Sequence, residues 1–188
     1  MECSLEDAID LFLSQSSDRA KMQPMDIYHA ALAAKKPEYV ALHDICKNHN
    51  IAIKGDDETD NVVGTFTSIS DGIKWIKGGK AELLDSMLTL LGKLEWNGYA
   101  DTYNGKAYTA KIIRALKSMY AYYEGRAEEM EEILVRKCKG TEFFVENIMT
   151  KTQAQIFDFL SQIVKYEMEN PFVMNKNTKK TKAKAKAV

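Results

Sequence analysis

The stretch "KAELLDSMLTLLGKLEW", Lys80–Trp96, decides the fold class of this chain. Its apolar residues recur at intervals of three and four, the spacing that places side chains on one face of an α-helix. The resulting apolar stripe is wide and comprises Leu83, Leu84, Met87, Leu90, Leu91 and Leu94. A helix with so broad an apolar face needs other elements to cover it, so the stretch predicts a compact multi-helix body.

The segments on either side carry further helix signals. Pro24 and Pro37 suit the first turn of a helix, ahead of "MDIYHAALAAK" and "EYVALHDICKNH". Further helices are predicted from about Leu5 to Gln15, in "SDGIKWIKGG", from about Lys106 to Tyr123, in "RAEEMEEILVRKCK", after a Thr141 cap, and after a capping box of Thr152 and Gln155. We therefore expect an all-α body of about eight helices over residues 1–170.

Two segments depart from this helical pattern. Residues 51–69, "IAIKGDDETDNVVGTFTSI", combine short β-branched runs with glycines and four acids. This composition predicts a short irregular or hairpin excursion, with a domain sub-boundary there left open. Residues 171–188 end in "NKNTKKTKAKAKAV", which has almost no large apolar side chain and predicts a disordered basic tail.

Composition restricts the class of protein. With 45% hydrophobic and 28% charged residues among 188, the chain resembles ordinary globular proteins. No window approaches 18 uninterrupted apolar residues, and the N-terminus carries acids where a secretory signal carries bases. The three cysteines are widely spaced, which fits reduced thiols. We expect an intracellular protein, cytoplasmic or nuclear, that is not secreted and does not bind membranes.

The net charge of −1 conceals an uneven distribution of charge. Residues 1–60 hold 6 basic residues against 12 acids, and residues 119–170 hold 6 against 10. Residues 61–118 hold 8 against 5, and residues 171–188 hold 6 lysines and no acid. Basic charge is therefore concentrated in the middle of the chain and at its C-terminal end.

The basic part of the middle region lies in "KAYTAKIIRALKSMYAYY", Lys106–Tyr123, where no acid occurs between Asp101 and Glu124. At about 100° per residue, four bases fall on the arc opposite the apolar face; they are Lys106, Lys111, Arg114 and Lys117. A surface of one sign is typical of contact with a phosphate backbone or an acidic protein. Tyrosines nearby offer rings for base stacking, namely Tyr99, Tyr103 and Tyr108. Pairing of this face with the acids of Glu128–Glu132 is the open alternative.

The tail supplies a second basic element, which can neutralise several phosphates without reading sequence. Its lysines are Lys176, Lys179, Lys180, Lys182, Lys184 and Lys186. Together the two elements predict a non-enzymatic nucleic-acid-associated protein of a small nucleoprotein or packaging type, with self-association into a homo-oligomer as an option. The alternative is a helical protein-interaction adaptor or inhibitor, with an acidic protein partner and no nucleic acid.

No catalytic or metal-binding signature fits the sequence. "LHDICKNHN" brings together His43, Cys46 and His49, but on a helix the two histidines are about 9 Å apart along the axis. We interpret Cys46 as a core residue, His49 as favourable near a helix C-terminus, and Asn50 as a left-handed cap. We therefore expect no metal, cofactor or catalytic residue. Binding of an ion by Cys46 or His49 is the alternative left open. Hydrolase, zinc-protease and dinucleotide-binding motifs do not occur.

Overall fold

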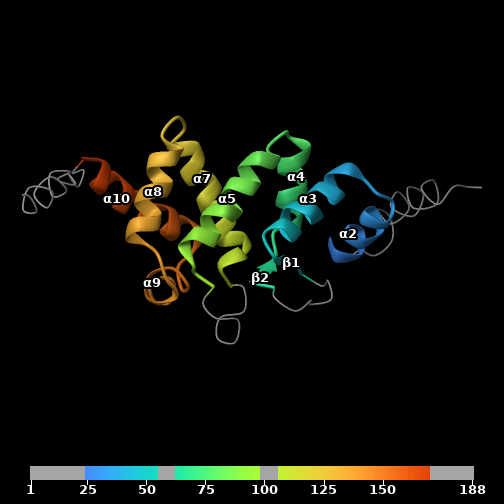
Figure 1. Cartoon of the computed structure of the whole chain (residues 1–188), viewed down its shortest axis with the longest axis horizontal. Helices are drawn as coiled ribbons and strands as arrows, with labels where there is room; N and C mark the ends of the chain where they lie inside the picture. Colours follow the sequence, from blue (N-terminus) through green and yellow to red (C-terminus); the bar gives the residue numbers. More distant parts are fainter. Residues whose placement is uncertain (1–23, 55–61, 98–105, 170–188) are drawn as a thin grey trace, which may run out of the picture.

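The computed structural model describes residues 24–54, 62–97 and 106–169, which form eight α-helices and two short strands (Figure 1). The helices are α2 (Pro24–Ala33), α3 (Pro37–Asn48), α4 (Ile69–Lys77), α5 (Ala81–Leu94), α7 (Ala110–Tyr122), α8 (Ala127–Lys137), α9 (Thr141–Asn147) and α10 (Gln153–Glu169). Strands β1 (Ile51–Ile53) and β2 (Gly64–Phe66) lie between α3 and α4, and a 3₁₀ turn, η1 (Lys106–Tyr108), precedes α7. The all-α class is confirmed. The predicted helix near residues 5–15 and the tail at 171–188 lie outside the described residues.

Local signals determine several helix ends. Pro24 and Pro37 begin α2 and α3, where the missing proline N–H costs no hydrogen bond. The chain leaves α3 through Asn50 at a φ of 54°, a left-handed conformation that asparagine tolerates well. The capping box before α10 is present, since the Thr152 N–H donates to Gln155 Oε1 at 3.0 Å and the Gln155 N–H donates to Thr152 Oγ1 at 3.4 Å.

The segment from Lys106 to Tyr123 is divided, where the sequence predicts one continuous helix. Lys106–Tyr108 forms η1, Thr109 is extended with a ψ of 154°, and α7 begins at Ala110. The Ala110 N–H donates to Thr67 Oγ1 at 3.2 Å. This contact with a distant segment of the chain places the helix start four residues later than the local pattern indicates.

The predicted cap of α9 is wrong. Gly140 occupies the N-cap position at a φ of 104°, and Thr141 is the first helical residue. The Thr141 hydroxyl donates instead to the Glu95 carbonyl oxygen at 3.3 Å. A positive φ is easily adopted by glycine, so the backbone turn into α9 depends on Gly140.

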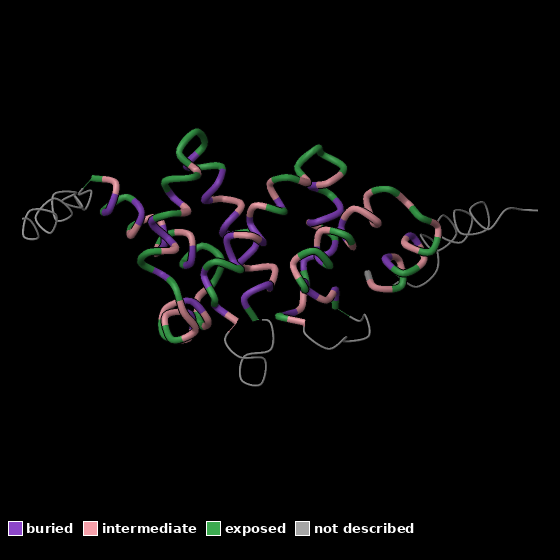
Figure 2. Tube along the Cα trace, in the orientation of Figure 1, coloured by how far each residue is buried: buried purple, intermediate pink, exposed green. Residues whose placement is uncertain are grey.

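The helices form an elongated body with α2 at one end and α10 at the other (Figure 1). Helix α5 lies in the middle and contacts α3, α4, α7 and α8, while α7 packs along α10. A continuous set of buried apolar side chains extends from Tyr28 to Val164. Figure 2 shows these buried positions on the inner sides of the helices. The stretch Lys80–Trp96 thus supplies the middle of the core.

Strands β1 and β2 pair in parallel, with Ile51–Ile53 opposite Gly64–Phe66. The hairpin alternative is therefore wrong, because a hairpin pairs its strands antiparallel. The first and last residues of both strands are buried. Beside β2, the Thr67 N–H donates to the Tyr108 carbonyl oxygen at 3.4 Å. This link brings the start of α7 next to the connection between β2 and α4.

Candidate functional site

Lys106 and Lys111, two of the four basic residues predicted for the body, have different surroundings in the structure. Lys106 lies in η1, is exposed, and forms no ion pair with another described residue. Lys111 is half-buried, and its Nζ donates to the carbonyl oxygens of Met149 at 2.6 Å and Lys151 at 3.0 Å. Because these carbonyls lie between α9 and α10, Lys111 holds that connection against α7.

The other two basic residues, Arg114 and Lys117, both contact α4. The Arg114 Nε donates to Asp71 Oδ2 at 2.6 Å, although the Arg114 side chain stays 48% exposed. The Lys117 Nζ lies 5.2 Å from the centroid of the Trp75 ring, within the range of a cation–π contact. The basic face of α7 therefore finds its partners on α4 and after α9, and not among residues 128–132.

Two of the four acids of residues 128–132, Glu129 and Glu131, have partners of their own. Glu131 accepts a hydrogen bond from the Tyr120 hydroxyl at 2.7 Å and lies 3.5 Å from the Lys93 Nζ. Burial, together with the adjacent Glu131 carboxylate, raises the pKa of Tyr120 above its ordinary value. Glu129 pairs at 2.8 Å with Arg126, the N-cap residue of α8. This cluster ties α8 to α5 and α7.

Of the tyrosines considered for base stacking, Tyr108 is only 1% exposed, so its ring is not accessible. Tyr99, Tyr103 and the six tail lysines lie outside the described residues. Tyr122 and Tyr166 are the exposed tyrosines of the described ranges, at 68% and 64%. Their exposure is not marked by any motif in the sequence.

Asp71 connects Arg114 to the start of α4. The hydroxyl of Ser68, a buried residue, donates to Asp71 Oδ2 at 2.6 Å. Burial alone would raise the pKa of Asp71, but the hydrogen bonds from Ser68 and Arg114 and the charges of Arg114 and Lys117 outweigh it and hold that pKa below its ordinary value. Asp71 is therefore ionised at neutral pH and keeps the guanidinium oriented.

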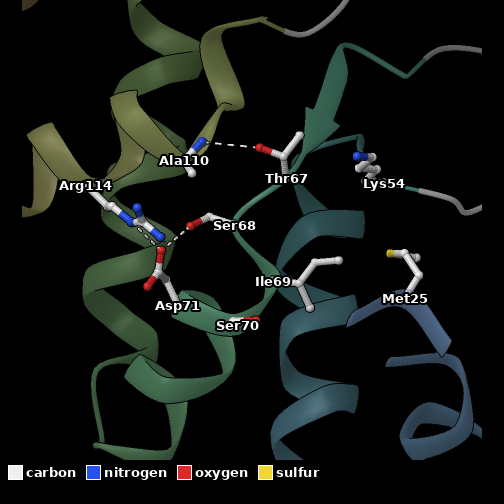
Figure 3. A pocket seen from close by; sticks show the side chains of 9 residues that line it. All are labelled: Met25, Lys54, Thr67, Ser68, Ile69, Ser70, Asp71, Ala110 and Arg114. Carbon is white, nitrogen blue, oxygen red and sulfur yellow. Dashed lines mark hydrogen bonds and ion pairs between the residues drawn. The ribbon is translucent and has the colours of Figure 1, made fainter. Parts of the chain in front are cut away.

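A pocket of about 240 Å³ opens beside this ion pair (Figure 3). Its walls are formed by Met25, Lys54, Thr67, Ser68, Ile69, Ser70, Asp71, Ala110 and Arg114. These residues come from α2, from the end of β1, from the β2–α4 connection with the first turn of α4, and from α7. Sequence reasoning identified Arg114 but missed Lys54, Ser70 and Asp71, because no local motif joins positions so far apart.

The residues of the histidine and cysteine cluster have separate structural contacts. Cys46 is buried, the His43 Nδ1 lies 3.1 Å from a tyrosine hydroxyl of α2, and the His49 Nε2 lies 2.8 Å from Asp85 Oδ1. Among the described residues, no three His, Cys, Asp or Glu side chains gather in a way that would hold a metal ion. Burial raises the pKa of Cys138 to about 12, so this thiol stays protonated at neutral pH.

Comparison of the chain with known protein families, characterised proteins and solved structures gives no match. Within residues 24–54, 62–97 and 106–169, no helix has both the length and the apolar character needed to cross a membrane.

Proposed function

We propose that this protein binds the phosphate backbone of nucleic acid without sequence readout and without catalysing a reaction. The observation that carries the proposal is the charge of residues 171–188, which hold six lysines and no acid. Each lysine that neutralises a phosphate releases a counterion, which makes binding favourable at low salt and weak at high salt.

The helical body contributes fewer contacts than its sequence suggests. Lys111 and Lys117 are engaged with the α9–α10 connection and with α4, so their role is structural. Lys106 is exposed and forms no ion pair with another described residue, and Arg114 keeps half of its side chain accessible. We therefore assign the body a supporting role through Lys106 and Arg114, and the tail the larger share of the electrostatic affinity.

The test is a salt series of affinity for a random duplex and a random single-stranded oligonucleotide. Replacing all six tail lysines by glutamine keeps the chain length and should reduce the slope of log K against log salt by up to about 5 on duplex, at about 0.9 for each phosphate. Lys106→Gln should reduce the slope by about 1. Lys47→Gln, at an exposed lysine of α3, is the matched control and should leave it unchanged.

A second candidate, a protein-interaction adaptor, is favoured by one observation: three of the four bases on the predicted face are already engaged within the body. If the intact chain binds neither oligonucleotide at low salt, the nucleic-acid proposal fails and the adaptor stands. If binding occurs but the tail variant keeps the full salt slope, the assignment of the affinity to the tail is overturned.

A further inference from the structure

The pocket beside Arg114 has the polar lining of an anion site. Two cationic side chains reach it from separate elements, Lys54 from the end of β1 and Arg114 from α7 (Figure 3). Lys54 is exposed and forms no ion pair with another described residue. Hydroxyl groups of Thr67, Ser68 and Ser70 lie on the wall between them.

The guanidinium of Arg114 is oriented but not saturated. Its Nε donates to Asp71, and no hydrogen bond from its two terminal amino groups to another described residue is formed. Asp71 thus fixes the plane of the guanidinium and neutralises one of the two positive charges. The described lining keeps a net charge of about +1 at neutral pH, counted from Lys54, Arg114 and Asp71.

The start of α4 offers backbone donors to the same pocket. Ser68 is the N-cap residue; its O–H donates to Asp71, and its oxygen accepts no capping hydrogen bond from the first turn of α4. The N–H groups of Ile69, Ser70 and Asp71 therefore have no hydrogen-bond partner among the described residues. These donors add to the two side-chain cations, which come from elsewhere in the fold.

The size of the pocket limits the ligand. Its volume of about 240 Å³ is below the roughly 300–1,000 Å³ of sites that enclose a whole small molecule. Among the described residues that line it, Met25, Ile69 and Ala110 are apolar, and none carries an aromatic ring that could stack on a base. A tetrahedral oxyanion fits this arrangement, since its oxygens accept from a guanidinium, a lysine, hydroxyls and N–H groups at once.

We propose that this pocket binds a phosphoryl group, held by Arg114, Lys54, Ser70 and the first N–H groups of α4. The group belongs either to a nucleic-acid backbone or to a free phosphorylated small molecule. The site stands independently of the proposed function, because none of the residues assigned to hold the phosphoryl group belongs to the tail.

The test uses inorganic phosphate added to the ¹⁵N-labelled full chain, with amide signals followed by NMR. We expect saturable shifts at Ile69, Ser70 and Asp71 that chloride at equal ionic strength does not produce. Lys54→Gln should weaken phosphate affinity about fivefold or more, and Lys47→Gln, on α3, should leave it unchanged. Arg114→Gln should weaken affinity about tenfold or more, and Lys54→Gln keeps the test valid if loss of the ion pair with Asp71 perturbs folding.

Two results would overturn the site. One is the absence of any saturable shift beyond that caused by chloride, and the other is an equal loss of affinity in Lys54→Gln and Lys47→Gln. A short single-stranded oligonucleotide then identifies the source. Competition between it and phosphate for the same amides supports a backbone phosphate, whereas shifts with free phosphate alone support a small phosphorylated ligand. The latter outcome leaves the pocket established while the nucleic-acid proposal is judged by its own salt series.

Discussion

Replacing Lys111 by methionine should destabilise the fold, whereas the same replacement at Lys106 should not. Both lysines belong to the basic face predicted from sequence, but the structure gives them different surroundings. The Lys111 Nζ donates to two carbonyl oxygens, at 2.6 and 3.0 Å, while Lys106 is exposed and forms no ion pair with another described residue. Methionine preserves most of the apolar stem, so the comparison isolates the ammonium group.

The expected magnitude follows from these two hydrogen bonds. A hydrogen bond to a charged group contributes about 1.5–3 kcal/mol, and the half-buried setting of Lys111 reduces the sum for both to about 2 kcal/mol. For a domain of this size that loss lowers Tm by about 4–8 °C. Lys106→Met should stay within about 0.5 kcal/mol of the original protein.

Urea and thermal melts followed by circular dichroism measure both variants. The salt slope of oligonucleotide binding, measured under folding conditions, should be unchanged by Lys111→Met and reduced by Lys106→Met. Equal stabilities of the two variants would refute the structural role of Lys111. A salt slope that falls with Lys111→Met would show that this lysine faces the ligand after all.

Four further substitutions test the packing, a hydrogen bond and an ion pair. Gly72→Ala places a Cβ 2.9 Å from Leu42 Cδ1. It should destabilise the fold, because overpacking costs about 1–3 kcal/mol and the gain in helix propensity is about 1 kcal/mol. Gly92→Ala is the control: its Cβ meets nothing within 4 Å, so it should stabilise by about 0.5–1 kcal/mol in the same urea melts. Trp96→Phe removes the indole donor to the carbonyl at the end of α8, and should cost about 1–3 kcal/mol in thermal unfolding; an unchanged Tm would contradict that bond. Hydrogen bonds and charge from Lys137 and Arg136 of α8 hold the pKa of Glu167 below its ordinary 4.5. The contribution of this carboxylate to folding stability is therefore complete above pH 4.5 and is lost as pH falls through the folded-state pKa. Thermal melts below pH 5 should therefore show a smaller loss of stability for Glu167→Gln than for the original chain. Identical pH profiles for the two chains would show that the Glu167 carboxylate contributes nothing to this loss.

The predictable part of the fold rests on short-range signals. Three such signals act over a few residues each, and each is present in the structure. They are the apolar period of Lys80–Trp96, the prolines that begin α2 and α3, and the capping box of α10. The start of α7 and the cap of α9 were misplaced, because Ala110 and Thr141 contact residues more than forty positions away. Parallel pairing of β1 and β2 was missed for a similar reason, since strand direction depends on the path of the connecting chain.

The candidate site shows the same division. Helical projection puts four bases on one face: Lys106, Lys111, Arg114 and Lys117. In the structure the last three lie on α7 outside its buried set, whereas Lys106 precedes that helix in η1. Projection of a single helix does not show which elements pack beside it. Only the packing of α4 and of the α9–α10 connection against α7 gives partners to Lys111, Arg114 and Lys117. Lys54 drew no attention in the sequence, because its importance depends on Arg114 lying across the same pocket.

By itself, the sequence determined the helical class, most of the helix positions and the separation of basic from acidic segments. Those properties follow from residue type and from periods of three to four residues, which act along the chain without tertiary contacts. The tertiary structure alone decided which basic side chains remain accessible, how Asp71 orients Arg114, and that a pocket exists between α4 and α7. These depend on long-range packing, because an ion pair or a cavity requires two surfaces that the local pattern does not bring together.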